Sequence, residues 1–169
     1  MVLAVGSPDA ARRAAAELET LPGVQMLTAD NAQLCKVGGR LLATPDPTNA
    51  GRANERQRLI VHTAASDLHD GLPAHRALIR ALRDVQPTAG VTVLHGVWGF
   101  QGDGPAQSDG MFQLGRRAPV TTVMIDTADR IAAAFDVVDE LTQGFGVVST
   151  GAVPAAVSID DGERRGGLE

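Results

Sequence analysis

The sequence predicts an α/β protein built from strand-helix-strand units. Two observations favour this class: short apolar runs alternate with segments of helical periodicity, and turns containing Gly or Pro separate them. Over residues 57–160 the expected order is β-α-β, loop, β-α-β, and a shorter β-α-β unit precedes it over residues 1–44. With 44% hydrophobic and 21% charged residues among 169, the chain has the composition of a globular protein with a buried core.

The first unit opens with an expected strand at residues 2–5, followed by a clear helix start. Ser7 is an expected N-cap, Pro8 takes the first helical position and Asp9 lies in the first turn. A second strand is expected within residues 22–30, and a further apolar piece over residues 32–45 is broken by two adjacent glycines. Residues 45–56 have almost nothing to bury, so they are the expected linker.

The main unit begins with an expected strand at residues 58–63 and a helix at 72–85. The helix places apolar side chains and one imidazole on a single face, namely Leu72, His75, Leu78, Ile79 and Leu82. A strand at residues 90–98 follows, and it leads into a long loop that ends before Pro119.

The second half of the main unit repeats this order. A strand is expected at residues 119–126, then a helix capped by Thr127, then a strand at residues 146–153. The buried face of the helix is expected to hold Ile131, Ala134, Phe135 and Val138. Residues 161–169 are polar and rich in Gly, so we expect a disordered tail there.

The two units share a pattern. When Gly6 is aligned with Asp126, the strands, the Ser and Thr caps, and an Asp at the second helical position coincide. Residues 1–44 therefore resemble the back half of a second copy of the main unit, although any two strand-cap-helix units look somewhat alike. A half copy cannot cover its own strands, so it would pack on the main unit, dock into an oligomer or lack upstream sequence.

Composition excludes several classes of function. The formal charge of −5 argues against general nucleic-acid binding, which needs clustered Lys and Arg. The single Cys35 excludes an intramolecular disulfide and a cysteine-rich zinc site, and it suits a reducing compartment. No apolar run is long enough to span a bilayer, and the N-terminus lacks the basic segment of a signal peptide. We therefore expect a cytoplasmic protein.

The loop after residue 94 holds the main candidates for ligand binding. Residues 94–104, LHGVWGFQGDG, contain four glycines, and glycine allows a ligand to approach the backbone closely. Neither of the two common glycine-rich nucleotide motifs fits the spacing, and no helix pattern follows. A plain flexible turn and a ligand-contacting loop both stay open.

Two further sets of side chains have chemistry suited to a ligand, namely the arginines that end the loop and the four histidines. Arg116 and Arg117 close the loop and could hold an anion, although a solvated pair is the simpler interpretation. The four His residues lack the spacing of a metal site, and no nucleophile-base arrangement is marked by the sequence. We therefore expect no catalytic residue, metal or cofactor.

The main unit resembles a known family. An acidic loop ends in Gly before a Pro-containing helix start, the second strand ends in a Gly-containing turn with Gly-Phe, and the third strand runs into Asp-Thr and a capped helix. The residues concerned are Asp67, Gly71, Pro73, Gly96, Gly99, Phe100, Pro119, Val120, Asp126 and Thr127. In order and spacing, residues 57–160 resemble the PII-like family called domain of unknown function 190 (DUF190).

This resemblance implies a ferredoxin-like β-α-β-β-α-β sandwich and a regulatory role without catalysis. It further implies a homotrimer whose intersubunit clefts bind a small anionic metabolite or nucleotide, with the loop after the second strand contacting a membrane transporter or channel. The ligand-binding residues that we assign are His95, Gly96, Gly99, Phe100, Gly102, Gly104, Arg116 and Arg117.

The chain also departs from the family pattern. Ala65 stands at a usually acidic position, and His95 stands where Arg is usual. A second interpretation therefore stays open, in which the chain is a degenerate structural module that only oligomerises with a paralogue.

Overall fold

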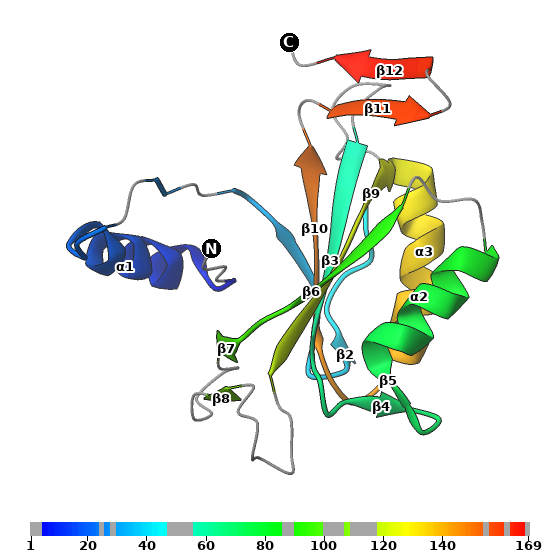
Figure 1. Ribbon diagram of the computed structural model, residues 1–169, viewed down its shortest axis with the longest axis horizontal. Helices are drawn as coiled ribbons and strands as arrows, with labels where there is room; N and C mark the ends of the chain where they lie inside the picture. Colours follow the sequence, from blue (N-terminus) through cyan, green and yellow to red (C-terminus); the bar gives the residue numbers. More distant parts are fainter. Residues whose placement is uncertain are drawn as a thin grey trace. The chain divides into compact units, whose positions relative to one another are not determined.

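The computed structural model describes residues 5–23, 26–27, 30–46, 56–85, 90–99, 107–108, 118–153, 156–160 and 163–167. The chain divides into two compact units, Met1–Asn31 and Ala32–Glu169. Both units are drawn in Figure 1. Most of the linker that we expected over residues 45–56 lies outside the described residues.

The first unit contains helix α1, Pro8–Glu19. The start of this helix is confirmed, because Ser7 is the N-cap and its side chain accepts a hydrogen bond from the Ala10 N–H. No residue of α1 is buried. The strand expected at residues 2–5 lies almost wholly outside the described residues, and Met26 and Leu27 belong to no strand.

The second unit is built on a six-stranded antiparallel sheet in the order β2-β1-β10-β3-β9-β6. Its four main strands are β3 (Arg56–Ala64), β6 (Val91–His95), β9 (Pro119–Thr127) and β10 (Val147–Val153). Helices α2 (Ala74–Val85) and α3 (Ala128–Leu141) connect β3 to β6 and β9 to β10. The chain order and the order β10-β3-β9-β6 are those of a ferredoxin-like sandwich, which confirms the predicted fold class.

Both helices cover the same face of the sheet, as Figure 1 shows, and the core lies between them and the strands. On α3 the buried residues are the four that its periodicity predicts. On α2 the prediction holds for His75, Leu78 and Leu82, but Ile79 is exposed and Leu72 precedes the helix. The core consists of Cys35, Leu59, Val61, Leu78, Leu82, Met124, Ile131, Ala134, Phe135, Val138 and Val148.

A hairpin from the N-terminal part of the chain extends this sheet. Strands β1 (Gln33–Val37) and β2 (Arg40–Leu41) were expected in the first unit, but β1 pairs with β10 of the main sheet. Gly38 and Gly39 form the turn, with φ of +56° and +80°, values that suit glycine. The two adjacent glycines indicate the turn between β1 and β2 from the sequence alone. The pairing with β10 could not be predicted in this way, because β10 lies more than a hundred residues away in the chain.

A buried lysine connects the β1–β2 hairpin to α3 through polar contacts. Lys36 is 1% exposed, and its Nζ lies 2.6 Å from both the backbone oxygen and Oδ1 of Asp139. The Gly38 N–H also donates to the backbone oxygen of Gly146, at 2.7 Å. The hairpin is therefore held by backbone pairing on one side and by the end of α3 on the other.

A second small hairpin lies between β3 and α2. Strands β4 (Leu68–His69) and β5 (Leu72–Pro73) are joined by Asp70 and Gly71, which have φ of +49° and +77°. An Asp-Gly pair with both φ values positive is a common two-residue hairpin turn. We expected an acidic loop here, whereas the Asp-Gly pair is the turn of a hairpin.

Two more pairs of short strands occupy regions expected to be irregular. Backbone pairing joins β11 (Ala156–Asp160) to β12 (Glu163–Gly167), so most of the expected tail at residues 161–169 forms a strand. Hydrogen bonds between backbones need no apolar side chains, which is why a polar sequence can form this hairpin. Strand β7 (Trp98–Gly99) pairs with β8 (Gln107–Ser108) within the long loop.

Candidate functional site

The candidate site begins where β6 ends. His95 is the last residue of β6 and pairs with Val120 of β9. The next residue continues the ladder, because the Gly96 N–H donates to the backbone oxygen of Pro119 at 2.8 Å. The loop after the second strand therefore leaves the sheet from a fixed point beside β9, with the side chain of His95 exposed.

Gly96 and Gly99 have a packing role at this point. A Cβ on either residue would lie 2.7 or 2.8 Å from Cγ of Pro119, closer than real atoms of this kind approach. Both positions therefore need glycine to let the chain turn over the proline ring. We assigned both to ligand binding, and this contact supplies a sufficient structural reason for each.

The other predicted ligand-binding residues lie outside the described residues, and they are Phe100, Gly102, Gly104, Arg116 and Arg117. Of the eight residues assigned from the sequence, the structure thus brings together His95, Gly96 and Gly99.

The structure places one further residue, His75, beside the candidate site, and the sequence did not predict this contact. The rings of His75 and His95 are in edge-to-face contact, with centroids 5.0 Å apart and an interplanar angle of 86°. His75 is 9% exposed, and burial lowers its pKa first, with smaller contributions from His95 and Arg76. Its Nδ1 is buried without a hydrogen-bond partner among the described residues. The sequence signal was the place of His75 on the buried face of its helix.

His62 lies apart from this pair. Strand β9 separates β3 from β6, so His62 and His95 lie on strands that are not neighbours. Nδ1 of His62 is 3.1 Å from Oγ1 of Thr121, while Nε2 is buried without a partner among the described residues. Burial lowers the pKa of His62. The described residues contain no cluster of three or more His, Cys, Asp or Glu side chains suited to a metal.

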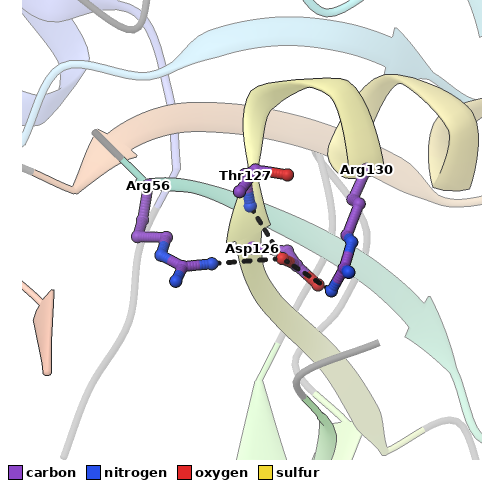
Figure 2. A network of polar contacts seen from close by, with 4 residues as sticks. All are labelled: Arg56, Asp126, Thr127 and Arg130. Carbon is purple, nitrogen blue, oxygen red and sulfur yellow. Dashed lines mark hydrogen bonds and ion pairs between the residues drawn. The ribbon is translucent and has the colours of Figure 1, made fainter. Parts of the chain in front are cut away.

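A buried carboxylate lies at the opposite end of β9 (Figure 2). Asp126 is 0% exposed, and its Oδ1 accepts hydrogen bonds from the Thr127 N–H at 2.8 Å and from Arg56 Nη1 at 3.2 Å. Nη1 of Arg130 lies 3.6 Å from the same oxygen. Thr127 has N-cap backbone geometry, but its side chain makes no capping hydrogen bond. Donors from three elements therefore meet at one acceptor, an arrangement that joins β3, β9 and α3.

The face of the sheet opposite α2 and α3 carries exposed apolar side chains. Cross-strand pairing and alternation place these residues on the face away from the core residues Leu59, Val61 and Met124. Each is between 39% and 42% exposed, and they are Leu34, Val37, Leu94 and Ile125. We call these four residues the open-face cluster. The register places the buried Ser149 and Ile60 between Leu34 and β9, so the four side chains are spread across this face. Exposed apolar side chains on a sheet face that no helix covers are available for association.

Cys35 is not a candidate for chemistry at the surface. It is fully buried, its Sγ lies 3.5 Å from Oγ1 of Thr150, and burial raises the pKa of its thiol. A raised pKa disfavours the thiolate, which is the reactive form. Within the described residues, no helix is long and apolar enough to cross a membrane.

Comparison with known proteins gives one finding on family. Residues 56–155 match the family DUF190, described as an uncharacterized ACR. The matched range starts with β3 and ends after β10, so it contains the ferredoxin-like core and excludes the β1–β2 hairpin. No curated protein matches the chain.

Proposed function

Because the chain belongs to the DUF190 family, we propose that it is a PII-like regulatory protein without catalytic activity. In this proposal it forms a homotrimer in the cytoplasm and binds a small anionic metabolite or nucleotide in the clefts between subunits. The loop after β6 changes conformation with the ligand and contacts a partner such as a membrane transporter or channel. The ferredoxin-like core, with its long loop after the second strand, supports this assignment.

The open-face cluster is the observation that supports the proposed oligomer. Leu34 and Val37 come from β1, Leu94 from β6 and Ile125 from β9, and neither α2 nor α3 covers their face. A second and third copy would remove this apolar surface from water, at roughly 25 cal/mol for each Å² buried. Association through the sheet face also leaves the loop after β6 at the border between subunits, where we propose the ligand.

Within that border, His95 and the two arginines of the loop have the chemistry for an anion. Arg116 and Arg117 can each donate two parallel hydrogen bonds to a phosphate or carboxylate. Gly96 and Gly99, packed on Pro119, would act as the rigid base from which the loop moves.

A second candidate function is an interaction module that has lost the ligand site and oligomerises with a paralogue. The packing of Gly96 and Gly99 on Pro119 favours it, because it explains two predicted ligand residues without a ligand. Both candidate functions predict an oligomer, but only the regulatory function predicts binding of a small molecule.

Light scattering on the purified chain tests the oligomer. We expect a trimer, and we expect Ile125→Glu to give monomers because it places a charge in the open-face cluster. Ile79→Glu is the matched control, since Ile79 is equally exposed but lies on α2. A wild-type monomer would refute the proposed oligomer, and dissociation of both variants alike would refute the open-face cluster as its interface.

Calorimetry with adenine nucleotides and cyclic nucleotides tests the ligand. We expect saturable heat from at least one of them, and loss of that heat in Arg116→Ala/Arg117→Ala. Arg80→Ala/Arg83→Ala, which removes two exposed charges of α2, controls for net charge. A trimer that gives no heat and no thermal shift with any nucleotide would favour the interaction module.

A further inference from the structure

The first unit, Met1–Asn31, has a helix whose apolar face stays accessible. Helix α1 has 12 residues, and helices this short are marginally stable in water unless one face is packed. None of its residues is buried, and Leu21, two residues after its end, is 53% exposed. Within the described residues, α1 therefore lacks the packing on which short helices depend.

This accessible face matches the buried face of α3 position by position. When Gly6 is aligned with Asp126, an apolar residue of the first unit stands opposite each residue through which α3 packs on the core. The matched pairs are Ala11 with Ile131, Ala14 with Ala134, Ala15 with Phe135, Leu18 with Val138 and Leu21 with Leu141. We call the five residues of the first unit the α1 stripe, namely Ala11, Ala14, Ala15, Leu18 and Leu21.

The main unit shows what covers a helix of this kind. Helix α2 follows β3 and α3 follows β9, and these two strands are antiparallel, so the two helices run in opposite directions. They also contact each other on one face of the sheet (Figure 1). Each β-α-β half of the sandwich thus brings an antiparallel helix to the other half. A unit whose sequence resembles one half would be covered by a second half of the same kind.

The charges of α1 suit a second copy of itself. Arg12 and Arg13 lie in its first half and Glu17 and Glu19 in its second half, with Arg12 and Glu19 on one flank of the α1 stripe. An antiparallel pair brings the arginines of each copy beside the glutamates of the other, whereas a parallel pair brings like charges together. Arg12 also forms an exposed ion pair with Asp9 of its own helix. A membrane surface is a poorer match, because α1 has no aromatic residue and no Lys.

We propose that α1 pairs antiparallel with α1 of a second copy of this chain, through the α1 stripe. A two-fold axis passes between Ala14 and Ala15, so that Ala14 of each copy lies against Ala15 of the other. The small side chains of the stripe allow the two helix axes to approach closely. This pair goes beyond the proposed regulatory function, because it involves neither the open-face cluster nor the loop after β6.

Disulfide trapping in the full chain tests the pair, because a covalent link captures a weak association of short helices. We expect Ala15→Cys, beside the two-fold axis, to form linked dimers under mild oxidation with copper phenanthroline at least about tenfold faster than Ala16→Cys. Ala16 is exposed and lies on the opposite side of α1, which makes it the matched control. The wild-type chain gives the background, since Cys35 is buried. Equal rates at the two positions would mean random collision and would overturn the proposal.

Three further variants test the direction of the pair, its face and its independence. In an antiparallel pair the two copies of Ala11 lie about 10 Å apart along the helices, so Ala11→Cys should link slowly. A rate equal to that of Ala15→Cys would indicate a parallel pair and contradict the proposal. Adding Leu18→Glu to Ala15→Cys should lower the rate to that of Ala16→Cys, and an unchanged rate would exclude the α1 stripe as the contact.

Adding Ile125→Glu to Ala15→Cys should leave the rate unchanged, even where it dissociates the proposed trimer. Failure of the trimer and failure of the pair are therefore measured separately. A fall as large as that caused by Leu18→Glu would refute a pair that forms through α1 alone.

Discussion

Individual polar residues are buried in the second unit in two different ways. Lys36 and Asp126 lie beside groups of opposite charge, on Asp139 and on two arginines respectively. His62 and His75 each bury one ring nitrogen without a partner in the described residues, and burial lowers the pKa of both. A neutral imidazole costs less to bury than a charged one, so the fold holds both rings in their neutral form.

The Asp126 network predicts a clear loss of stability on neutralisation. Asp126→Asn keeps the shape and an oxygen for the Thr127 N–H, but it removes the charge that faces Arg56 and Arg130. We expect the free energy of unfolding, measured in urea, to fall by about 2 kcal/mol. Asp136→Asn on the exposed side of α3 should change it by less than about 0.5 kcal/mol. Equal losses would mean that the network adds nothing specific.

His62 predicts a dependence of stability on pH. Its pKa is lower in the folded chain than in the unfolded chain, so the unfolded state binds more protons as the pH falls through about 6.5. Stability is therefore full above that pH and decreases below it. We expect His62→Gln to lose less stability than the wild type between about pH 7.5 and about pH 5.5. His75 contributes with the same sign, so part of the loss should remain. An unchanged loss in His62→Gln would contradict this account.

At the scale of elements, the β1–β2 hairpin offers a matched pair of glycines. Both have positive φ, but a Cβ on Gly38 meets nothing within 4 Å, whereas a Cβ on Gly39 would lie 2.1 Å from the backbone nitrogen of Gly144. Gly38→Ala should therefore cost only the backbone strain, about 1 kcal/mol. Gly39→Ala must also displace the hairpin from the turn after α3, and we expect a loss of at least about 2 kcal/mol. Urea unfolding of both variants measures the difference, and similar costs would refute the close contact.

The elements themselves were largely predictable, because their signals are local. Helical spacing gave all four buried residues of α3, and Ser7 with Pro8 gave the start of α1. The errors came where a local signal was misinterpreted or absent. Asp70–Gly71 is a hairpin turn that we treated as part of a loop, and Glu163–Gly167 is a strand made of residues that favour no strand.

At the scale of the whole molecule, prediction failed where residues distant in sequence meet. The pairing of β1 with β10 and the contact of His75 with His95 both depend on the order of strands in the sheet. The same holds for the candidate site, because the packing of Gly96 and Gly99 involves Pro119 on another strand. Spacing within one segment contains no information on such partners, so the sequence located the loop but not its neighbours.

Truncation tests the division of the chain into units. No residue of α1 is buried, and the compact second unit begins at Ala32, so a protein of residues 32–169 should keep its free energy of unfolding within about 0.5 kcal/mol. A protein of residues 56–169 retains the region matched by the family but loses the hairpin.

The shorter protein should be much less stable. It leaves the outer edge of β10 unpaired, opens the core at Cys35 and removes the lysine beside Asp139, so we expect a loss of at least about 3 kcal/mol. Thermal and urea unfolding of the two truncated proteins compare these predictions directly. Equal stability of the two would mean that the family core folds without the hairpin. A large loss in the 32–169 protein would instead mean that the first unit supports the second.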